Sequence, residues 1–180
     1  MTPTQLDPAA ALAARLWLLG ERAIGVLKAL QPLALLSARI YVASVFFRSG
    51  LTKLRDWDTT VSLFTDEYHV PLLSPELAAA LGTGGELVLP VLLVLGLFGR
   101  FAAAGLTVVN VVAVISLMEI AEAALLGHVF WGSLLMAVLL WGPGAISVDR
   151  FAVPALRRRV FGDEPSAIDA AAASPVSRVA

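Results

Sequence analysis

The stretch PELAAALGTGGELVLPVLLVLGLF, residues 75–98, decides the fold class of this 180-residue chain. After Glu76 at its start, its only charged residue is Glu86. A run of about 18 or more apolar residues is typical of a helix that spans a membrane. The run is too long for a barrel strand, and backbone groups in lipid must be satisfied within a helix or a closed barrel. We therefore interpret residues 75–98 as a transmembrane helix.

Three further apolar runs of similar length lie on either side of this one. They cover about residues 32–51, 101–120 and 124–146. The whole chain is 58% hydrophobic and 15% charged, whereas a soluble domain is nearer half apolar and about a quarter charged. Only the connection over residues 52–74 is long. The sequence therefore predicts an all-α protein built as a four-helix transmembrane bundle.

Two amphipathic helices are expected outside the spans. Over residues 9–30 one face collects apolar residues, namely Leu12, Leu16, Leu19, Ala23, Leu27 and Leu30. Charged residues beside that face favour a helix in the membrane interface over an extra span, which stays the alternative. Gln31 and Pro32 are expected to break the chain before the first span. In the first extracytoplasmic loop, the helical spacing of Trp57, Val61, Phe64 and Tyr68 predicts a second helix, flat on the membrane surface.

The distribution of lysine and arginine predicts the orientation of the chain. With four spans both termini lie on one side, and that side carries most of the cations, including Arg157, Arg158 and Arg159. The positive-inside rule predicts a bacterial cytoplasmic (inner) membrane protein with both termini in the cytoplasm. The expected organisation is a tail and interfacial helix over 1–31, a membrane domain over 32–152 and a basic, then disordered, tail over 153–180.

Composition excludes several kinds of site. The chain has no cysteine, so it contains no disulfide, thiolate metal site or thiol relay of its own. Its two histidines, His69 and His128, are not placed for a haem between two spans, and no ligand spacing indicates a metal site. No basic stripe suggests nucleic acid, and no phosphate-binding loop or hydrolase motif occurs.

Charged side chains inside the apolar runs are the candidate functional residues. A charge at bilayer depth costs about 3 kcal/mol or more unless it is paired or reaches water. With the predicted orientation, Arg48, Lys53, Glu86, Glu119 and His128 fall in the outer half of the bundle. They could form a polar pocket for a quinone head group or a small polar substrate, with Glu86 relaying protons. Alternatively they form structural ion pairs that set helix register, with Arg48 reaching to the surface.

Two further polar positions are interpreted as structural. Arg39 lies about two turns into the first span, and Asp149 follows the fourth span. Both fall near the cytoplasmic face, so we predict an Arg39–Asp149 ion pair. Asn110 lies at mid-depth in the third span, where an amide is typical of hydrogen bonding between helices.

Several motifs, in order along the chain, resemble those of the DoxX family. The first span carries Arg39-Ile-Tyr and then Phe47-Arg48-Ser-Gly-Leu-Thr-Lys53-Leu. The second carries Glu86-Leu87 and then Leu95-Gly-Leu-Phe-Gly-Arg100, and the fourth is followed by Gly142-Pro-Gly144 and Ser147-Val-Asp149. The resemblance covers about residues 33–152.

This resemblance implies a four-helix membrane protein associated with quinone-linked oxidoreductases or with complexes of the oxidative or thiol stress response. The first hypothesis is a non-autonomous membrane subunit of such a complex, with no covalent cofactor and with a quinone as its candidate ligand. The second is a non-catalytic membrane anchor or export protein in a metal- or redox-stress system. Both hypotheses expect a protein partner encoded nearby, in addition to the lipid bilayer.

Overall fold

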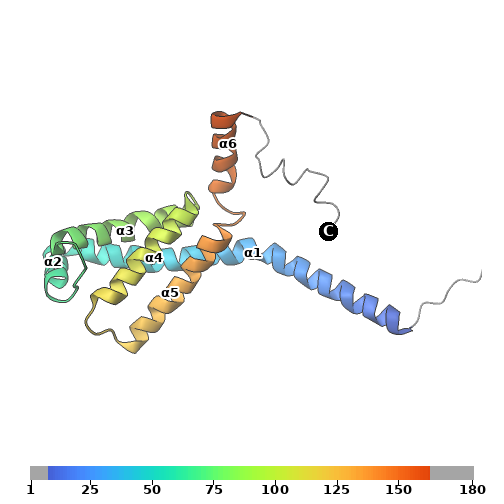
Figure 1. The fold of residues 1–180 in the computed structure, drawn as a ribbon, viewed down its shortest axis with the longest axis horizontal. Coiled ribbons are helices and arrows are strands. Elements are labelled where there is room, and N and C mark those ends of the chain that lie inside the picture. The colour runs from blue at the N-terminus through green and yellow to red at the C-terminus, as the bar shows by residue number, and fades with distance from the viewer. Residues whose placement is uncertain (1–7, 163–180) are drawn as a thin grey trace, which may run out of the picture.

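The computed structural model describes residues 8–162, in which it places six helices and no named strand (Figure 1). The helices are α1 (Pro8–Arg55), α2 (Trp57–Asp66), α3 (Pro75–Leu95), α4 (Gly99–Ser116), α5 (Glu122–Trp141) and α6 (Asp149–Phe161). Four of them, α1, α3, α4 and α5, are long and apolar enough to cross a membrane. The predicted all-α fold with four spans is confirmed. Residues 163–180, which hold most of the C-terminal tail predicted to be disordered, lie outside the described residues.

The bundle is formed by the second half of α1 together with α3, α4 and α5. α1 packs against α3 and α5, and α4 packs against the same two helices, which closes a four-helix arrangement. The core contains many small side chains, which let the helix backbones approach closely in a membrane. The buried hydrophobic cluster consists of Val42, Ala43, Phe46, Leu93, Ala102, Ala103, Leu106, Leu135 and Val138.

α1 is one continuous helix, so the break predicted at Gln31 and Pro32 is wrong. Its 48 residues extend about 72 Å at 1.5 Å per residue, over twice the thickness of a bilayer hydrocarbon core. The half predicted as a separate helix is present, but it continues the span and projects beyond the bundle (Figure 1). Proline leaves only one helical carbonyl, that of Lys28, without its N–H partner, and the helix continues through Pro32.

α2 and α3 each begin at a residue whose side chain caps the helix. A carboxylate oxygen of Asp56 accepts the backbone N–H of Thr59 at 3.0 Å, and this hydrogen bond lowers the pKa of Asp56. The hydroxyl of Ser74 accepts the N–H of the third residue of α3 at 3.4 Å. α2 packs across the ends of α1 and α3, where the ring of Phe64 lies over Gly82.

Arg39 is fully buried at the end of the bundle from which α1 projects. Its guanidinium donates from Nη1 to the carbonyl of Leu93 at 3.4 Å and from Nη2 to the carbonyl of Ile146. One acceptor belongs to the last turn of α3, and the other to the segment between α5 and α6. Arg39 therefore connects three separate parts of the chain from inside the core.

Asp149 lies at the same end, but its carboxylate makes different contacts from those predicted. Its two oxygens accept the backbone N–H groups of Phe98 at 2.8 Å and of Gly99 at 2.7 Å. Within residues 8–162 no direct ion pair joins Asp149 to Arg39, although Asp149 is near enough for its charge to act on the guanidinium. Free N–H donors at the positive end of α4 compete well for a carboxylate, and Arg39 takes carbonyl oxygens instead.

Backbone hydrogen bonds complete this end of the bundle. The N–H of Val148 donates to the carbonyl of Leu95 at 3.0 Å, and that of Asp149 to the carbonyl of Gly96 at 2.9 Å. We call these contacts, with those of Arg39 and the Asp149 carboxylate, the Arg39 clamp. The clamp holds the α3–α4 turn against the chain that follows α5.

Gly96 is the position in the clamp that tolerates substitution least. Its φ is +63°, and a methyl group there would come within 2.5 Å of Ser147 Cβ and closer still to Arg39. A left-handed backbone costs about 1–2 kcal/mol for an L-residue before any clash. We expect Gly96→Ala to lower the free energy of unfolding by about 2 kcal/mol or more, measured as a lower thermal midpoint in detergent.

The matched control is Gly84→Ala in α3, where a methyl group would meet nothing within 4 Å. Alanine is the better helix former by about 1 kcal/mol, so this variant should keep or raise the midpoint. Equal midpoints for the two variants would contradict the role assigned to Gly96.

Candidate functional site

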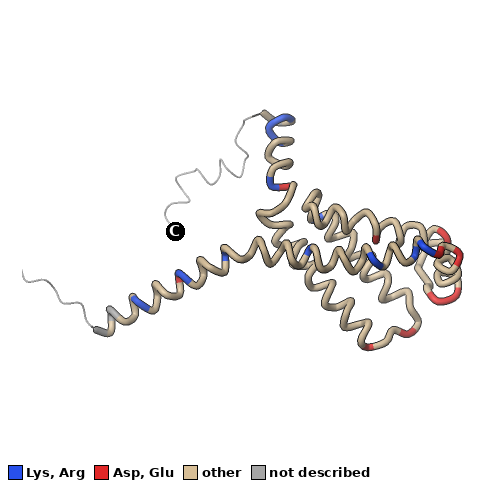
Figure 2. Tube along the Cα trace, turned by 180° about the vertical axis from the view of Figure 1, so that it is seen from behind, with Lys and Arg blue, Asp and Glu red and all other residues tan. Residues whose placement is uncertain are grey.

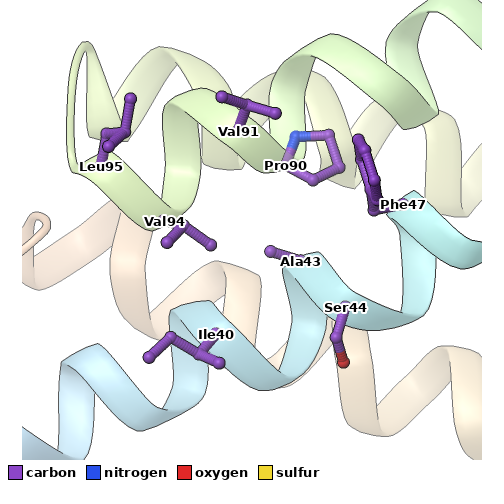
Figure 3. Close-up of a pocket in the computed structure, with 8 residues that line it drawn as sticks. All are labelled: Ile40, Ala43, Ser44, Phe47, Pro90, Val91, Val94 and Leu95. Atoms are coloured by element: carbon purple, nitrogen blue, oxygen red, sulfur yellow. The ribbon is translucent and has the colours of Figure 1, made fainter.

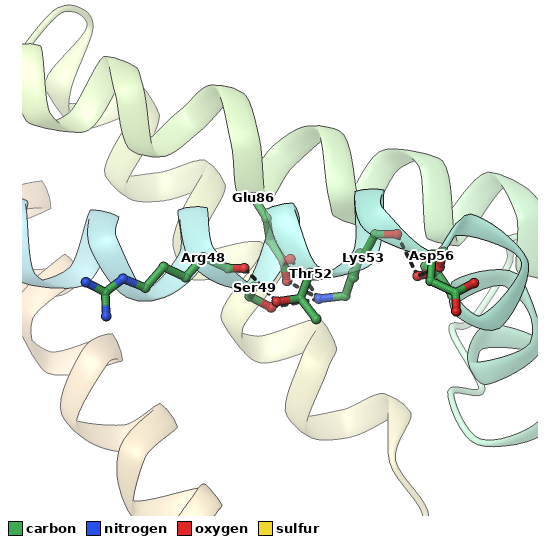
Figure 4. Close-up of polar contacts among 7 residues, drawn as sticks. Arg48, Ser49, Thr52, Lys53, Asp56 and Glu86 are labelled. Carbon is green, nitrogen blue, oxygen red and sulfur yellow. Dashed lines mark hydrogen bonds and ion pairs between the residues drawn. The ribbon is translucent and has the colours of Figure 1, made fainter.

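Lys53 and Glu86 form a close ion pair between α1 and α3 (Figure 4). The ammonium nitrogen of Lys53 lies 2.7 Å from one carboxylate oxygen of Glu86 and 2.9 Å from the other. It also donates to the hydroxyl of Ser49 at 2.8 Å. The two side chains are 20% and 9% exposed, so the pair is largely shielded and its hydrogen-bonding groups are satisfied within the protein.

A glycine on α1 lets these two side chains meet. A methyl group at Gly50 would lie 3.0 Å from Cβ of Glu86 and 3.0 Å from the side chain of Leu87. α1 and α3 therefore approach closely at this level, as small residues allow in membrane bundles. One turn after Ser49, Lys53 reaches across the contact to Glu86.

A cavity of about 400 Å³ lies beside the ion pair, under α2 and the loop that follows it. Few of the side chains in its wall are polar, and most of the others are aliphatic, including Val108, Val109 and Val112 of α4. The residues that bring polar atoms are Lys53, Glu86, Tyr68 and Ser116. The arrangement is typical of a site for a mainly apolar molecule with a small polar part.

Tyr68 is a wall residue that sequence reasoning did not select as a site residue. Burial, then the negative charges of Glu67 and Glu86, raise the pKa of its hydroxyl. A phenol hydroxyl is a hydrogen-bond donor at neutral pH in any case, and Tyr68 lines the cavity. Its ring lies 5.0 Å from that of Phe64, and the helical spacing of these two aromatic residues was the only signal in the sequence.

Arg48 and Glu119 are not brought to the cavity. Arg48 is exposed, and its side chain extends away from Lys53 (Figure 4). Five helical residues turn by about 500°, which leaves these two cations about 140° apart around α1. Glu119 is exposed in the connection between α4 and α5. The predicted outer cluster is thus reduced to Lys53 and Glu86, because equal depth does not imply a shared face.

His128 joins α5 to α4 rather than lining the cavity. Its ring Nδ1 lies 2.8 Å from the amide oxygen of Asn110, and the amide nitrogen donates to the carbonyl of His128 at 3.0 Å. The imidazole packs edge-on against Trp131, with ring centroids 5.0 Å apart. Asn110 hydrogen-bonds between helices, as its position in the sequence suggested. Across residues 8–162 no group of three acidic or imidazole side chains could hold a metal ion.

Comparison with known proteins gives the family. The sequence profile of the DoxX family matches residues 34–119. The chain is 30% identical over 134 residues to inner membrane protein YphA of Escherichia coli (strain K12), an alignment that covers 68% of this chain and 92% of that protein. The chain belongs to the DoxX family. It is an integral membrane protein with several apolar helices. No solved structure matches it.

The matched range of this DoxX protein includes Arg39, Gly50, Lys53, Glu86 and Gly96. It therefore covers both the ion pair beside the cavity and the centre of the Arg39 clamp. A second hollow, a groove of about 330 Å³ between α1 and α3, is lined by aliphatic and aromatic side chains, Pro90 and Ser44 (Figure 3). No charged side chain lines it, so it suits an acyl chain rather than acid–base chemistry.

The ion pair predicts a specific pattern of stabilities. Lys53→Met leaves the Glu86 carboxylate without its cation, and we expect the free energy of unfolding to fall by about 1–3 kcal/mol. Lys53→Met combined with Glu86→Met should recover most of this loss, since removing both charges also removes the desolvation cost. Thermal midpoints in detergent measure both effects.

Lys28→Met, on the exposed part of α1, is the matched control and should leave the midpoint unchanged. If the double variant loses as much free energy of unfolding as Lys53→Met and Glu86→Met lose together, the result would argue against the pairing.

Proposed function

We propose that the cavity beside Lys53 and Glu86 binds the head group of a quinone, and that this DoxX protein is the membrane subunit of a quinone-linked oxidoreductase or oxidative-stress complex. One observation carries the proposal: an aliphatic cavity of about 400 Å³ has an ion pair and a protonated tyrosine in its wall. The association of the family with quinone-linked enzymes supports it.

The wall of the cavity fits the chemistry of a quinone. Aliphatic side chains of α3 and α4 can cover a flat ring, while Tyr68 and Lys53 supply donors for its carbonyl oxygens. Lys53 can give a proton to a reduced oxygen of the ring, and Glu86, 2.7 Å away, can accept a proton and stabilise the ammonium form of Lys53. A bound quinone would supply a two-electron acceptor.

A partner protein belongs to this proposal. The chain has no cysteine, so electrons from a thiol substrate would have to enter through another protein. We expect this protein to be encoded nearby, as is common for the soluble component of a membrane enzyme. The DoxX protein would then contribute the quinone site and the membrane attachment.

Quinone retention tests the proposal directly. Protein purified in mild detergent should carry quinone in its lipid extract, and added quinone should raise its thermal midpoint. Tyr68→Phe removes one donor and should weaken quinone binding at least about tenfold, or about 1.4 kcal/mol. Glu86→Gln keeps size and hydrogen bonding but removes the charge, so it should fold and lose quinone-dependent activity.

Tyr41→Phe is the control, because Tyr41 lies on the exposed face of α1 and does not line the cavity. An extract without quinone, together with no quinone-dependent change in midpoint, would contradict the proposal.

A second candidate function is that of a membrane anchor for a partner in a metal- or redox-stress system. The observation that favours it is the projecting half of α1, on which large apolar side chains such as Leu16, Trp17 and Leu27 are more than half exposed. This half can dock a soluble protein or lie against the bilayer. The anchor function needs no quinone.

Orientation is part of both candidate functions, and we propose an inner-membrane protein with cytoplasmic termini. Lysine and arginine occur along the projecting half of α1 and on α6, whereas acidic residues gather at the opposite end (Figure 2). The positive-inside rule places the first end in the cytoplasm. The inner-membrane relative supports the choice of membrane.

Cysteine labelling tests the orientation, since the chain has no cysteine of its own. Gly20→Cys lies in open space on the projecting half of α1, and Leu72→Cys lies on the fully exposed loop at the other end. A membrane-impermeant maleimide should label the Leu72→Cys variant in spheroplasts, and the Gly20→Cys variant only in inverted vesicles. A docked partner should protect the thiol of the Gly20→Cys variant in native membranes but not after purification.

The opposite labelling pattern would overturn the orientation. Protection of the Gly20→Cys thiol on both sides, even in reconstituted vesicles of the purified protein, would place residues 9–30 in the bilayer and remove the docking surface.

A further inference from the structure

A cleft of about 640 Å³ opens at the end of the bundle that holds the Arg39 clamp. The cavity beside Lys53 and Glu86, called the quinone cavity below, lies at the opposite end. The cleft lies between the start of α4, the end of α5 and the start of α6. Its wall differs in kind from that of the quinone cavity, because it combines two arginines with three large aromatic side chains. Neither candidate function uses this cleft.

The arginines of the cleft are available to a ligand. Arg100 donates from Nε to the carbonyl of Leu139 at 3.1 Å and from Nη2 to the carbonyl of Leu140 at 3.3 Å. A guanidinium has five N–H donors, so others remain for a ligand, and the side chain is exposed. Arg150, in the first turn of α6, is exposed as well.

The acid in the same wall does not cancel this positive charge. Both oxygens of the Asp149 carboxylate already accept backbone N–H groups, those of Phe98 and Gly99. The cleft wall thus carries two cations and one carboxylate, and that carboxylate is already bound to the start of α4. The cleft therefore favours an anion.

The aromatic residues indicate the depth at which the cleft lies. Phe98, Phe101 and Trp141 are each more than 60% exposed, and they occur at the ends of α4 and α5. Tryptophan at the end of a membrane helix is typical of the head-group region, and Trp141 ends α5. The cleft therefore opens where lipid phosphates lie.

The position of α6 is independent evidence that the cleft lies at the depth of the lipid head groups. It leaves the bundle and runs across the direction of α1 (Figures 1 and 2), so it lies along the membrane surface if α1 spans the membrane. Val153, Leu156 and Val160 recur at helical spacing, and each is more than half exposed. Arginines flank this apolar stripe, a pattern that binds the surface of an anionic bilayer.

We propose that the cleft binds the head group of an anionic phospholipid from the leaflet against which α6 lies. Arg100 and Arg150 donate to the phosphate oxygens, and the upper parts of the acyl chains pack on Phe98 and Phe101. Bound lipid would join α4, α5 and α6 on the outside of the Arg39 clamp. The site is distinct from the quinone cavity and does not depend on it.

Lipid-dependent stability of the full-length protein in detergent tests this proposal. Phosphatidylglycerol in mixed micelles should raise the thermal midpoint, and phosphatidylcholine at the same concentration should raise it much less. Inorganic phosphate should have no effect, because it lacks the acyl chains. Arg150→Gln should weaken phosphatidylglycerol binding at least about tenfold while the protein still folds, since Arg150 is exposed and outside the clamp.

Arg55→Gln removes an exposed cation at the other end of α1 and is the matched control. Arg100→Gln should also weaken phosphatidylglycerol binding, but it removes two hydrogen bonds to α5 as well. Equal effects of the two lipids, or of Arg150→Gln and Arg55→Gln, would overturn the proposal. Stabilisation by phosphate alone would assign the cleft to a soluble anion and would overturn it as well.

Discussion

The constraint on which the rest of this structure depends is the burial of Arg39. A guanidinium inside an apolar bundle needs acceptors, and carbonyl groups at the end of α3 and between α5 and α6 supply two of them, while its buried Nε has no partner among the described residues. The negative end of the α3 dipole adds to the attraction. These contacts require the α3–α4 turn to pass close to the guanidinium, which only glycine permits at residue 96. One buried cation in α1 thus determines how two connections, α3–α4 and α5–α6, are arranged.

The two ends of the bundle use charge in different ways. At one end Arg39 is enclosed within the bundle and donates to backbone carbonyls. At the other end Lys53 and Glu86 satisfy each other while forming part of a cavity wall. A shielded ion pair contributes little net stability, because the desolvation of two charges offsets most of their attraction. Its position in the wall of an otherwise aliphatic cavity supports the proposed ligand site.

The bundle accounts for only part of the chain. Half of α1 projects from one end, and α6 crosses the same end (Figure 1). Both carry arginines and exposed apolar residues, a composition typical of helices at a membrane surface. The opposite end is compact by comparison, with α2 folded over α1 and α3. This asymmetry separates the cavity beside Lys53 and Glu86 at one end from the exposed basic and apolar helices at the other.

The sequence by itself determined the number of helices that can span a membrane, the polar residues that can cap α2 and α3, and the position of each charged residue along its helix. These follow from local rules: the length of an apolar run, the chemistry of a cap and the cost of a charge in lipid. Only the tertiary structure decided which charges meet. Rotation of each helix about its axis directs Arg48 away from Lys53, and neighbouring backbone groups draw Arg39 and Asp149 apart. Continuity of α1 through Pro32 was likewise not predicted from the sequence, because a proline removes one helical hydrogen bond and can either end a helix or be accommodated within it.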